Sequence, residues 1–148
     1  MKRIIICFFL FLVFSWLITG SGFPQSGGSK IKDDVSPVIS KLKVNPLSGA
    51  YGTVIGITIE IYDPQGLNNV RHELHQIREG IEPILLKLYD DGTHGDNTAH
   101  DRIFSGETRV PKTAAPGVHE FKVVVFDKNG NRSNLLAYKF TVLKLLEV

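Results

Sequence analysis

Apolar and polar residues alternate along several short stretches of the chain after residue 37. In the clearest stretch, TVIGITIEIY, every second residue is isoleucine: Ile55, Ile57, Ile59 and Ile61. This period of two is typical of a strand with one buried face. EFKVVVF and LAYKFTV repeat the pattern, which predicts inward side chains at Phe121, Val123, Val125, Leu136, Tyr138, Phe140 and Val142.

The same alternation predicts a strand near residue 40, with Val38, Leu42 and Val44 facing inward between Lys41 and Lys43. Weaker strand candidates cover residues 70–77, 84–89 and 103–110. Turn-forming residues separate nearly all of these stretches, as in NPLSGAYG, DPQGLNN and DKNGNRSN. Seven short strands without a helical period predict an all-β fold, a single antiparallel two-sheet sandwich over residues 37–148.

The N-terminal residues 1–22 have the layout of a secretory signal peptide. Lys2 and Arg3 precede an apolar run over residues 4–18, which is shorter than the roughly 20 residues of a spanning helix. We expect export to the periplasm, the cell envelope or the outside, with an uncleaved anchor helix as the alternative to cleavage. Residues 23–36 are rich in Ser, Gly and charge, and this composition predicts a flexible linker.

Cleavage of residues 1–22 would change the net charge of the chain and remove its cysteine. The chain has 17 basic and 15 acidic residues, so removing Lys2 and Arg3 leaves 15 of each. No basic cluster then remains to bind nucleic acid. Cys7, the only cysteine, lies in the apolar run, so the domain is expected to fold without a disulfide.

Four segments, SPVISKLKVNP, ITIEIYDPQGLNNVRHEL, LYDDGTHGDNTAHDRIFSG and HEFKVVVFDKNGNRSN, carry a resemblance to a known family. Across residues 36–142 the chain resembles the bacterial immunoglobulin-like domains of exported and cell-surface proteins. The resemblance implies an immunoglobulin-like sandwich of about seven strands. In that family the domain is usually a module attached to enzymatic or adhesive domains, so it implies no specific activity.

The most specific part of the resemblance is an aspartate-rich loop, similar to an L-x-D-D-G-x-x-G-D-x-x-A-G-D-G-x-Y segment of that family. The matching residues are Leu88, Asp90, Asp91, Gly92, Gly95, Asp96, Ala99 and Asp101, with Phe104 at the aromatic position. His100 and Arg102 stand where the family has glycine.

Four aspartates in this loop are candidate metal ligands for calcium: Asp90, Asp91, Asp96 and Asp101. Calcium prefers six to eight hard oxygens, and clustered carboxylates repel one another without a cation. The spacing does not match an EF-hand loop, because Asp101 stands where that loop has a bidentate glutamate. The alternative is structural, since Asp and Asn side chains cap their own turns by accepting backbone N–H bonds.

The histidines and the short motifs of the chain do not match a known catalytic or zinc-binding pattern. His72 and His75 are three residues apart, whereas a zinc helix needs two histidines at i and i+4. His94 and His100 lie in the acidic loop, where they could join a site for a softer metal. The sequence has no nucleophile elbow, Walker loop or dinucleotide-binding motif.

These observations predict an exported, non-enzymatic binding or structural module whose acidic loop is stabilised by calcium. A small metal-dependent hydrolase built on the acidic loop with His94 or His100 is one alternative. An accessory subunit that pairs with a partner through an edge strand is another. The expected partner is an unknown protein or glycan, nucleic acid is not expected, and the membrane is contacted only through an uncleaved N-terminal segment.

Overall fold

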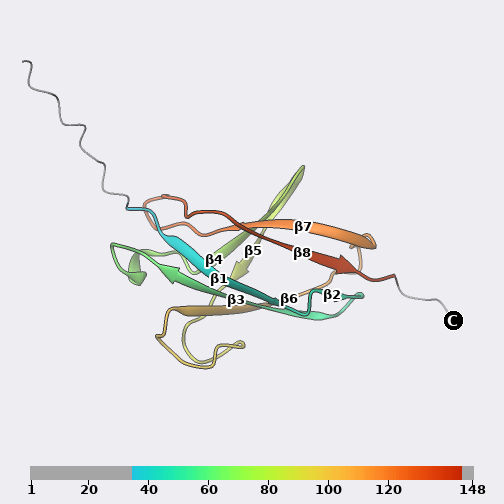
Figure 1. The fold of residues 1–148 in the computed structure, drawn as a ribbon, viewed down its shortest axis with the longest axis horizontal. Coiled ribbons are helices and arrows are strands. Elements are labelled where there is room, and N and C mark those ends of the chain that lie inside the picture. Colours follow the sequence, from blue (N-terminus) through green and yellow to red (C-terminus); the bar gives the residue numbers. More distant parts are fainter. Residues whose placement is uncertain (1–34, 145–148) are drawn as a thin grey trace, which may run out of the picture. The chain divides into compact units, whose positions relative to one another are not determined.

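A computed structural model describes residues 35–144 (Figure 1), so the predicted signal peptide and most of the predicted linker lie outside the described residues. The elements are β1 (Val38–Asn45), β2 (Ser48–Gly49), β3 (Val54–Tyr62), η1 (Leu67–Asn69), β4 (Glu73–Arg78), β5 (Ile81–Lys87), β6 (Ile103–Arg109), β7 (Gly117–Val124) and β8 (Leu136–Val142). Within this range no helix has the length and apolar character that crossing a membrane requires.

The strands form two sheets, which confirms the predicted all-β sandwich. One sheet has the order β1-β3-β6, and the other has the order β2-β8-β7-β4-β5. All seven predicted strands are present. The two-residue strand β2 is an addition, and it pairs with β8 in parallel, whereas the other pairs are antiparallel.

The isoleucines of β3 form the centre of the core between the sheets. Ile57, Ile59 and Ile61 are fully buried and Ile55 is nearly so, as the period of two predicts. Side chains of the opposite sheet, including Leu74, Val123 and Phe140, belong to the same buried cluster. Burial of each such side chain stabilises the fold by about 1.5–3 kcal/mol.

The predicted inward face of β1 is wrong at its first residue. Val38 is 46% exposed, whereas its neighbour Ile39 is 2% exposed and belongs to the core. The pairing of β1 with β3 shifts register between Ser40 and Lys43, and Lys41 adopts a φ of 52°. This bulge adds one residue, so the inward positions change from odd to even numbers along the strand.

The chain crosses from one sheet to the other where β5 ends. Leu88 is buried, and Tyr89 then pairs with Ser105 through two backbone N–H···O bonds of 2.8 Å. On β6, a Cβ atom at Gly106 would lie 2.5 Å from the carbonyl oxygen of Lys87, so only glycine lets the two strands approach this closely. The residues between Tyr89 and Ser105 are thereby closed into a loop at one end of β5 and β6.

Candidate functional site

The loop that joins β5 to β6 brings three of the four predicted aspartates together. Asp90, Asp96 and Asp101 each offer one carboxylate oxygen, and these oxygens all lie within 4.8 Å of one another. Asp96 is buried, Asp90 is half-buried and Asp101 is exposed. Among residues 35–144, no other group of three His, Cys, Asp or Glu side chains converges in this way.

Backbone N–H groups hold the buried carboxylate of Asp96 in place. The N–H of Gly92 donates to Asp96 Oδ2 at 2.7 Å, and the N–H of Thr98 donates to Asp96 Oδ1 at 3.1 Å. The left-handed backbone at Gly92, with φ of 77°, and at Gly95, with φ of 86°, allows the sharp turns that this arrangement needs. These bonds orient Asp96 and occupy only some of the lone pairs of its carboxylate.

The Asp90 carboxylate closes the loop because it also accepts two backbone N–H groups. It accepts the N–H of Asp101 at 3.2 Å and the N–H of Arg102 at 3.3 Å. The Asp101 carboxylate in turn accepts the N–H of Ile103 at 2.8 Å. The self-capping that the sequence predicts as the alternative role is therefore part of the geometry, and it places the three carboxylates side by side.

Asp91 lies outside the group of three carboxylates. Its Oδ1 accepts the N–H of Thr93 at 3.0 Å and also the Thr93 hydroxyl. The hydroxyl bond is the main reason why the pKa of Asp91 is lowered from its ordinary value. Asp91 is thus an exposed turn cap, and the structure does not place it with the other predicted ligands.

Two residues of the loop, His100 and Arg102, adopt a backbone conformation that glycine favours. His100 has a φ of 64° and Arg102 has a φ of 72°, both in the left-handed region. Because L-residues reach this region only at some cost in energy, the loop keeps its turns despite unfavourable residues. The later half of the loop therefore turns at both positions.

The loop histidines do not join the carboxylate group. The ring of His94 stacks on Tyr89 with 3.8 Å between ring centroids, and its Nδ1 lies 2.6 Å from Thr93 Oγ1. Outside the loop, the rings of His72 and His75 contact Phe104 and Phe126 respectively, so they do not form a zinc pair. The converging ligand atoms are all oxygens, which suit a hard cation such as calcium.

The DKNGNRS segment between β7 and β8 forms a turn that caps itself. Asp127 is fully buried and accepts the N–H and the side-chain Nδ2 of Asn131, both at 2.7 Å. Burial acts to raise the pKa of Asp127, but the bonds from Asn131 and Asn69 outweigh it and the net pKa is lowered. The segment therefore forms the turn that the sequence predicts between the last two strands.

Three aromatic side chains near the surface, Tyr62, Tyr89 and Phe126, differ in how far they are covered. Tyr62 is exposed, whereas Tyr89 stacks on His94 and the ring of Phe126 packs edge-on against His75. On β7, Val124 is fully buried, although the alternation of the strand places it outward.

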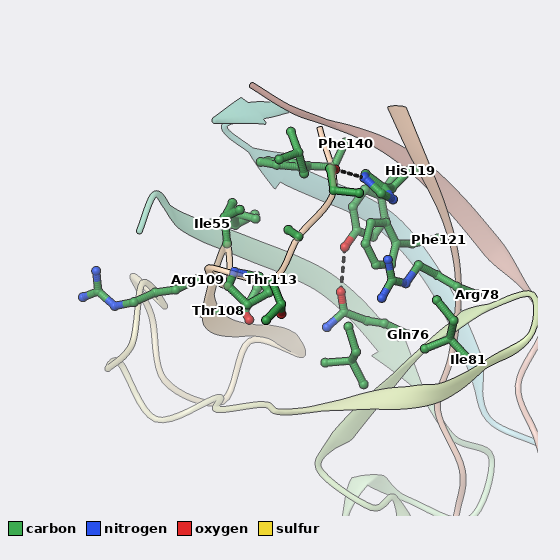
Figure 2. A pocket seen from close by; sticks show the side chains of 17 residues that line it. Ile55, Gln76, Arg78, Ile81, Thr108, Arg109, Thr113, His119, Phe121 and Phe140 are labelled. Atoms are coloured by element: carbon green, nitrogen blue, oxygen red, sulfur yellow. Dashed lines mark hydrogen bonds between the residues drawn. The ribbon is translucent and has the colours of Figure 1, made fainter. Parts of the chain in front are cut away.

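A cavity between the sheets is a feature that sequence reasoning missed. It has a volume of about 320 Å³ and is lined by residues of both sheets (Figure 2). Its polar lining residues are Gln76, Arg78, Thr108, Arg109, Thr113, His119 and Tyr138. The available signal was the alternation of β4, in which Gln76 stands at an inward position two residues after the buried Leu74.

Comparison with known proteins identifies structures of similar architecture. No family model matches the chain, and no curated protein matches it. A PKD domain of an M14-like peptidase from a Thermoplasmatales archaeon has 17% identity and a TM-score of 0.45, over 74% of this chain and 97% of that one. The SrpA adhesin of Streptococcus sanguinis has 17% identity and a TM-score of 0.49, over 77% of this chain and 60% of that one. The chain therefore spans less than two thirds of the adhesin, and neither likeness identifies an activity.

Proposed function

We propose that this chain is an exported, non-catalytic β-sandwich module for binding or support, and that calcium stabilises its acidic loop. The observation that carries the calcium proposal is the convergence of Asp90, Asp96 and Asp101 within 4.8 Å. The export proposal rests on the signal-like composition of residues 1–22.

The spacing of the three carboxylates suits a calcium ion. Calcium–oxygen bonds are about 2.3–2.6 Å long, so two ligands of one ion lie at most about 5 Å apart. All three oxygens satisfy this limit. A surface hollow of about 430 Å³ is lined by Asp96 and Asp101 and gives solvent, and therefore an ion, access to them. Water would complete the six to eight oxygens that calcium takes.

A cation at this place would strengthen the fold because the ligands converge only in the folded loop. A ligand that binds the folded state alone adds about 2.7 kcal/mol at one hundred times its dissociation constant. The bound ion would stabilise the loop that joins β5 to β6. The result would be a rigid end of the sandwich, where loops can present a binding surface.

The positions of His94 and His100 disfavour the hydrolase alternative, because neither side chain belongs to the converging group. That alternative needs a histidine beside the carboxylates to act as ligand or base. His94 instead stacks on Tyr89 and contacts Thr93. A non-catalytic role is the simpler account of a loop whose carboxylates are held by backbone N–H groups.

Calorimetric titration of calcium into the full chain tests the proposal. The wild type is expected to bind one calcium ion. Asp101→Asn removes one charge of the converging group and is expected to weaken binding roughly tenfold or more. Asp91→Asn removes an equal charge outside the group, so it serves as the matched control and should bind nearly as tightly as the wild type. Absence of calcium binding, or equal weakening in both variants, would reject the site.

A further inference from the structure

The cavity between the sheets lies at the other end of β5 and β6 from the acidic loop. Its walls include Ile81 and Ile84 at the start of β5 and Thr108 and Arg109 at the end of β6. The acidic loop instead follows the end of β5 and precedes β6. The two sites share no residue, so the cavity is independent of the proposed calcium loop.

Most of the cavity wall is apolar. Its deeper part is formed by core side chains, among them Ile55, Val110, Phe140 and Val142. Ile81 and Ile84, both exposed to solvent, lie on the side of β5. The cavity therefore offers an apolar interior with an apolar entrance, as sites for small apolar molecules do.

Gln76 places an unpartnered amide in this apolar interior. The residue is only 2% exposed, and its Oε1 accepts the hydroxyl of Tyr138 at 2.6 Å. Its Nε2 is buried and has no hydrogen-bond partner. Figure 2 shows the amide end of Gln76 pointing into the space between the lining side chains. An unpaired buried donor costs about 1–3 kcal/mol, so a ligand with an acceptor would relieve this cost.

Arg78 and Tyr138 also place donors in the cavity, and Thr108, Thr113 and His119 complete its polar lining with groups that can donate or accept. The guanidinium of Arg78 lies 5.1 Å from the centre of the Phe121 ring, and its Nε is buried without a partner. Burial raises the pKa of Tyr138 to about 12, so its phenol stays protonated at neutral pH. Arg109 also borders the cavity, but its guanidinium donates to the carbonyl of Gly52 at 3.3 Å and points away in Figure 2.

The geometry points to a binding site for a small monocarboxylate with an apolar body, such as a medium-chain fatty acid. Its carboxylate would accept hydrogen bonds from Gln76 Nε2 and Arg78, and its chain would lie against the isoleucines and Phe140. A carboxylate matches the donors because it is an acceptor with a charge opposite to that of Arg78. A volume of about 320 Å³ holds roughly ten non-hydrogen atoms at about 30 Å³ each, which is the size of octanoate.

Titration of the full chain with octanoate in EDTA tests this site without contribution from the acidic loop. NMR of the Gln76 side-chain amide in the wild type reports whether octanoate reaches the cavity. Calorimetry then compares octanoate with neutral 1-octanol in three proteins. These are the wild type, Arg78→Gln, and Arg132→Gln as the matched control, because Arg132 is exposed and does not line the cavity.

The site predicts one bound octanoate and a shift of the Gln76 amide signals. Arg78→Gln should weaken octanoate roughly tenfold and leave 1-octanol almost unchanged, because only the charged pair is lost. Arg132→Gln should bind as the wild type does. An unmoved Gln76 signal at millimolar octanoate would overturn the proposal and leave water as the occupant. Binding that Arg78→Gln does not weaken would also overturn it, because the fatty acid would then bind elsewhere on the chain.

Discussion

The carboxylate of Asp90 accepts the backbone N–H of Asp101 at 3.2 Å, although the two residues are eleven positions apart. This bond closes the acidic loop and returns the Asp101 side chain to the side of Asp90. The three converging carboxylates therefore depend on the backbone turns between them.

Replacing His100 or Arg102 with glycine should stabilise the domain or leave its stability unchanged. Both residues have positive φ, which costs an L-residue roughly 1–2 kcal/mol and costs glycine almost nothing. Glycine loses about 0.5–1 kcal/mol through greater freedom of the unfolded chain, so the net gain lies between zero and about 1.5 kcal/mol. Urea unfolding of each variant measures the change. A loss of more than about 1 kcal/mol would show that these side chains stabilise the loop.

Gly106→Ala should destabilise the domain by about 2 kcal/mol. The new Cβ would lie 2.5 Å from the Lys87 carbonyl oxygen and 3.1 Å from Leu86 Cγ, so β5 and β6 must move apart. Gly56→Ala on β3 is the matched control, since its nearest atom is the Asn45 carbonyl oxygen at 3.6 Å. Urea unfolding should show a loss only for Gly106→Ala. Equal effects of both variants would contradict the close approach.

The inward residues of β3 were predictable from sequence because nothing interrupts their period of two. The β1 error at Val38 arose from a bulge at Lys41, whose left-handed backbone leaves no mark in the apolar pattern. The sequence predicts all four aspartates as one group, and the separation of Asp91 was not predictable because it depends on a local bond to Thr93. The alternation of β4 places Gln76 inward, but the cavity around it was not predictable because strands far apart in sequence contribute its walls.

The domain should lose stability as the pH falls from 7.5 to 5.5, and His75 should cause part of this loss. Burial lowers the pKa of His75, an effect that Glu73 opposes and Arg71 reinforces. In the unfolded chain His75 takes up a proton when the pH falls below the ordinary histidine pKa of about 6.5. In the folded domain His75 stays neutral to a lower pH, so protonation favours the unfolded chain. Stability is therefore complete above about pH 6.5 and falls as the pH drops through the lowered folded pKa.

Urea unfolding of the wild type and of His75→Phe at the two pH values measures this contribution. Phenylalanine keeps a ring against Phe126, which His75 contacts at 4.8 Å between centroids, and it cannot take up a proton. The variant should lose less free energy of unfolding than the wild type over this range. An equal loss in both proteins would assign the pH dependence to other groups.

The most direct test of the calcium-stabilised module is thermal unfolding of the full chain in EDTA, in magnesium and in calcium, with Asp101→Asn alongside. At one hundred times the dissociation constant, calcium should raise the melting temperature of the wild type by roughly 10 °C. Magnesium should raise it less, because its bonds of about 2.0–2.1 Å demand a tighter octahedral site. In EDTA the variant should be at least as stable as the wild type, since asparagine can still accept the Ile103 N–H and removes one repelling charge. The account would be contradicted if calcium did not raise the melting temperature of the wild type, or if it raised that of Asp101→Asn by the same amount.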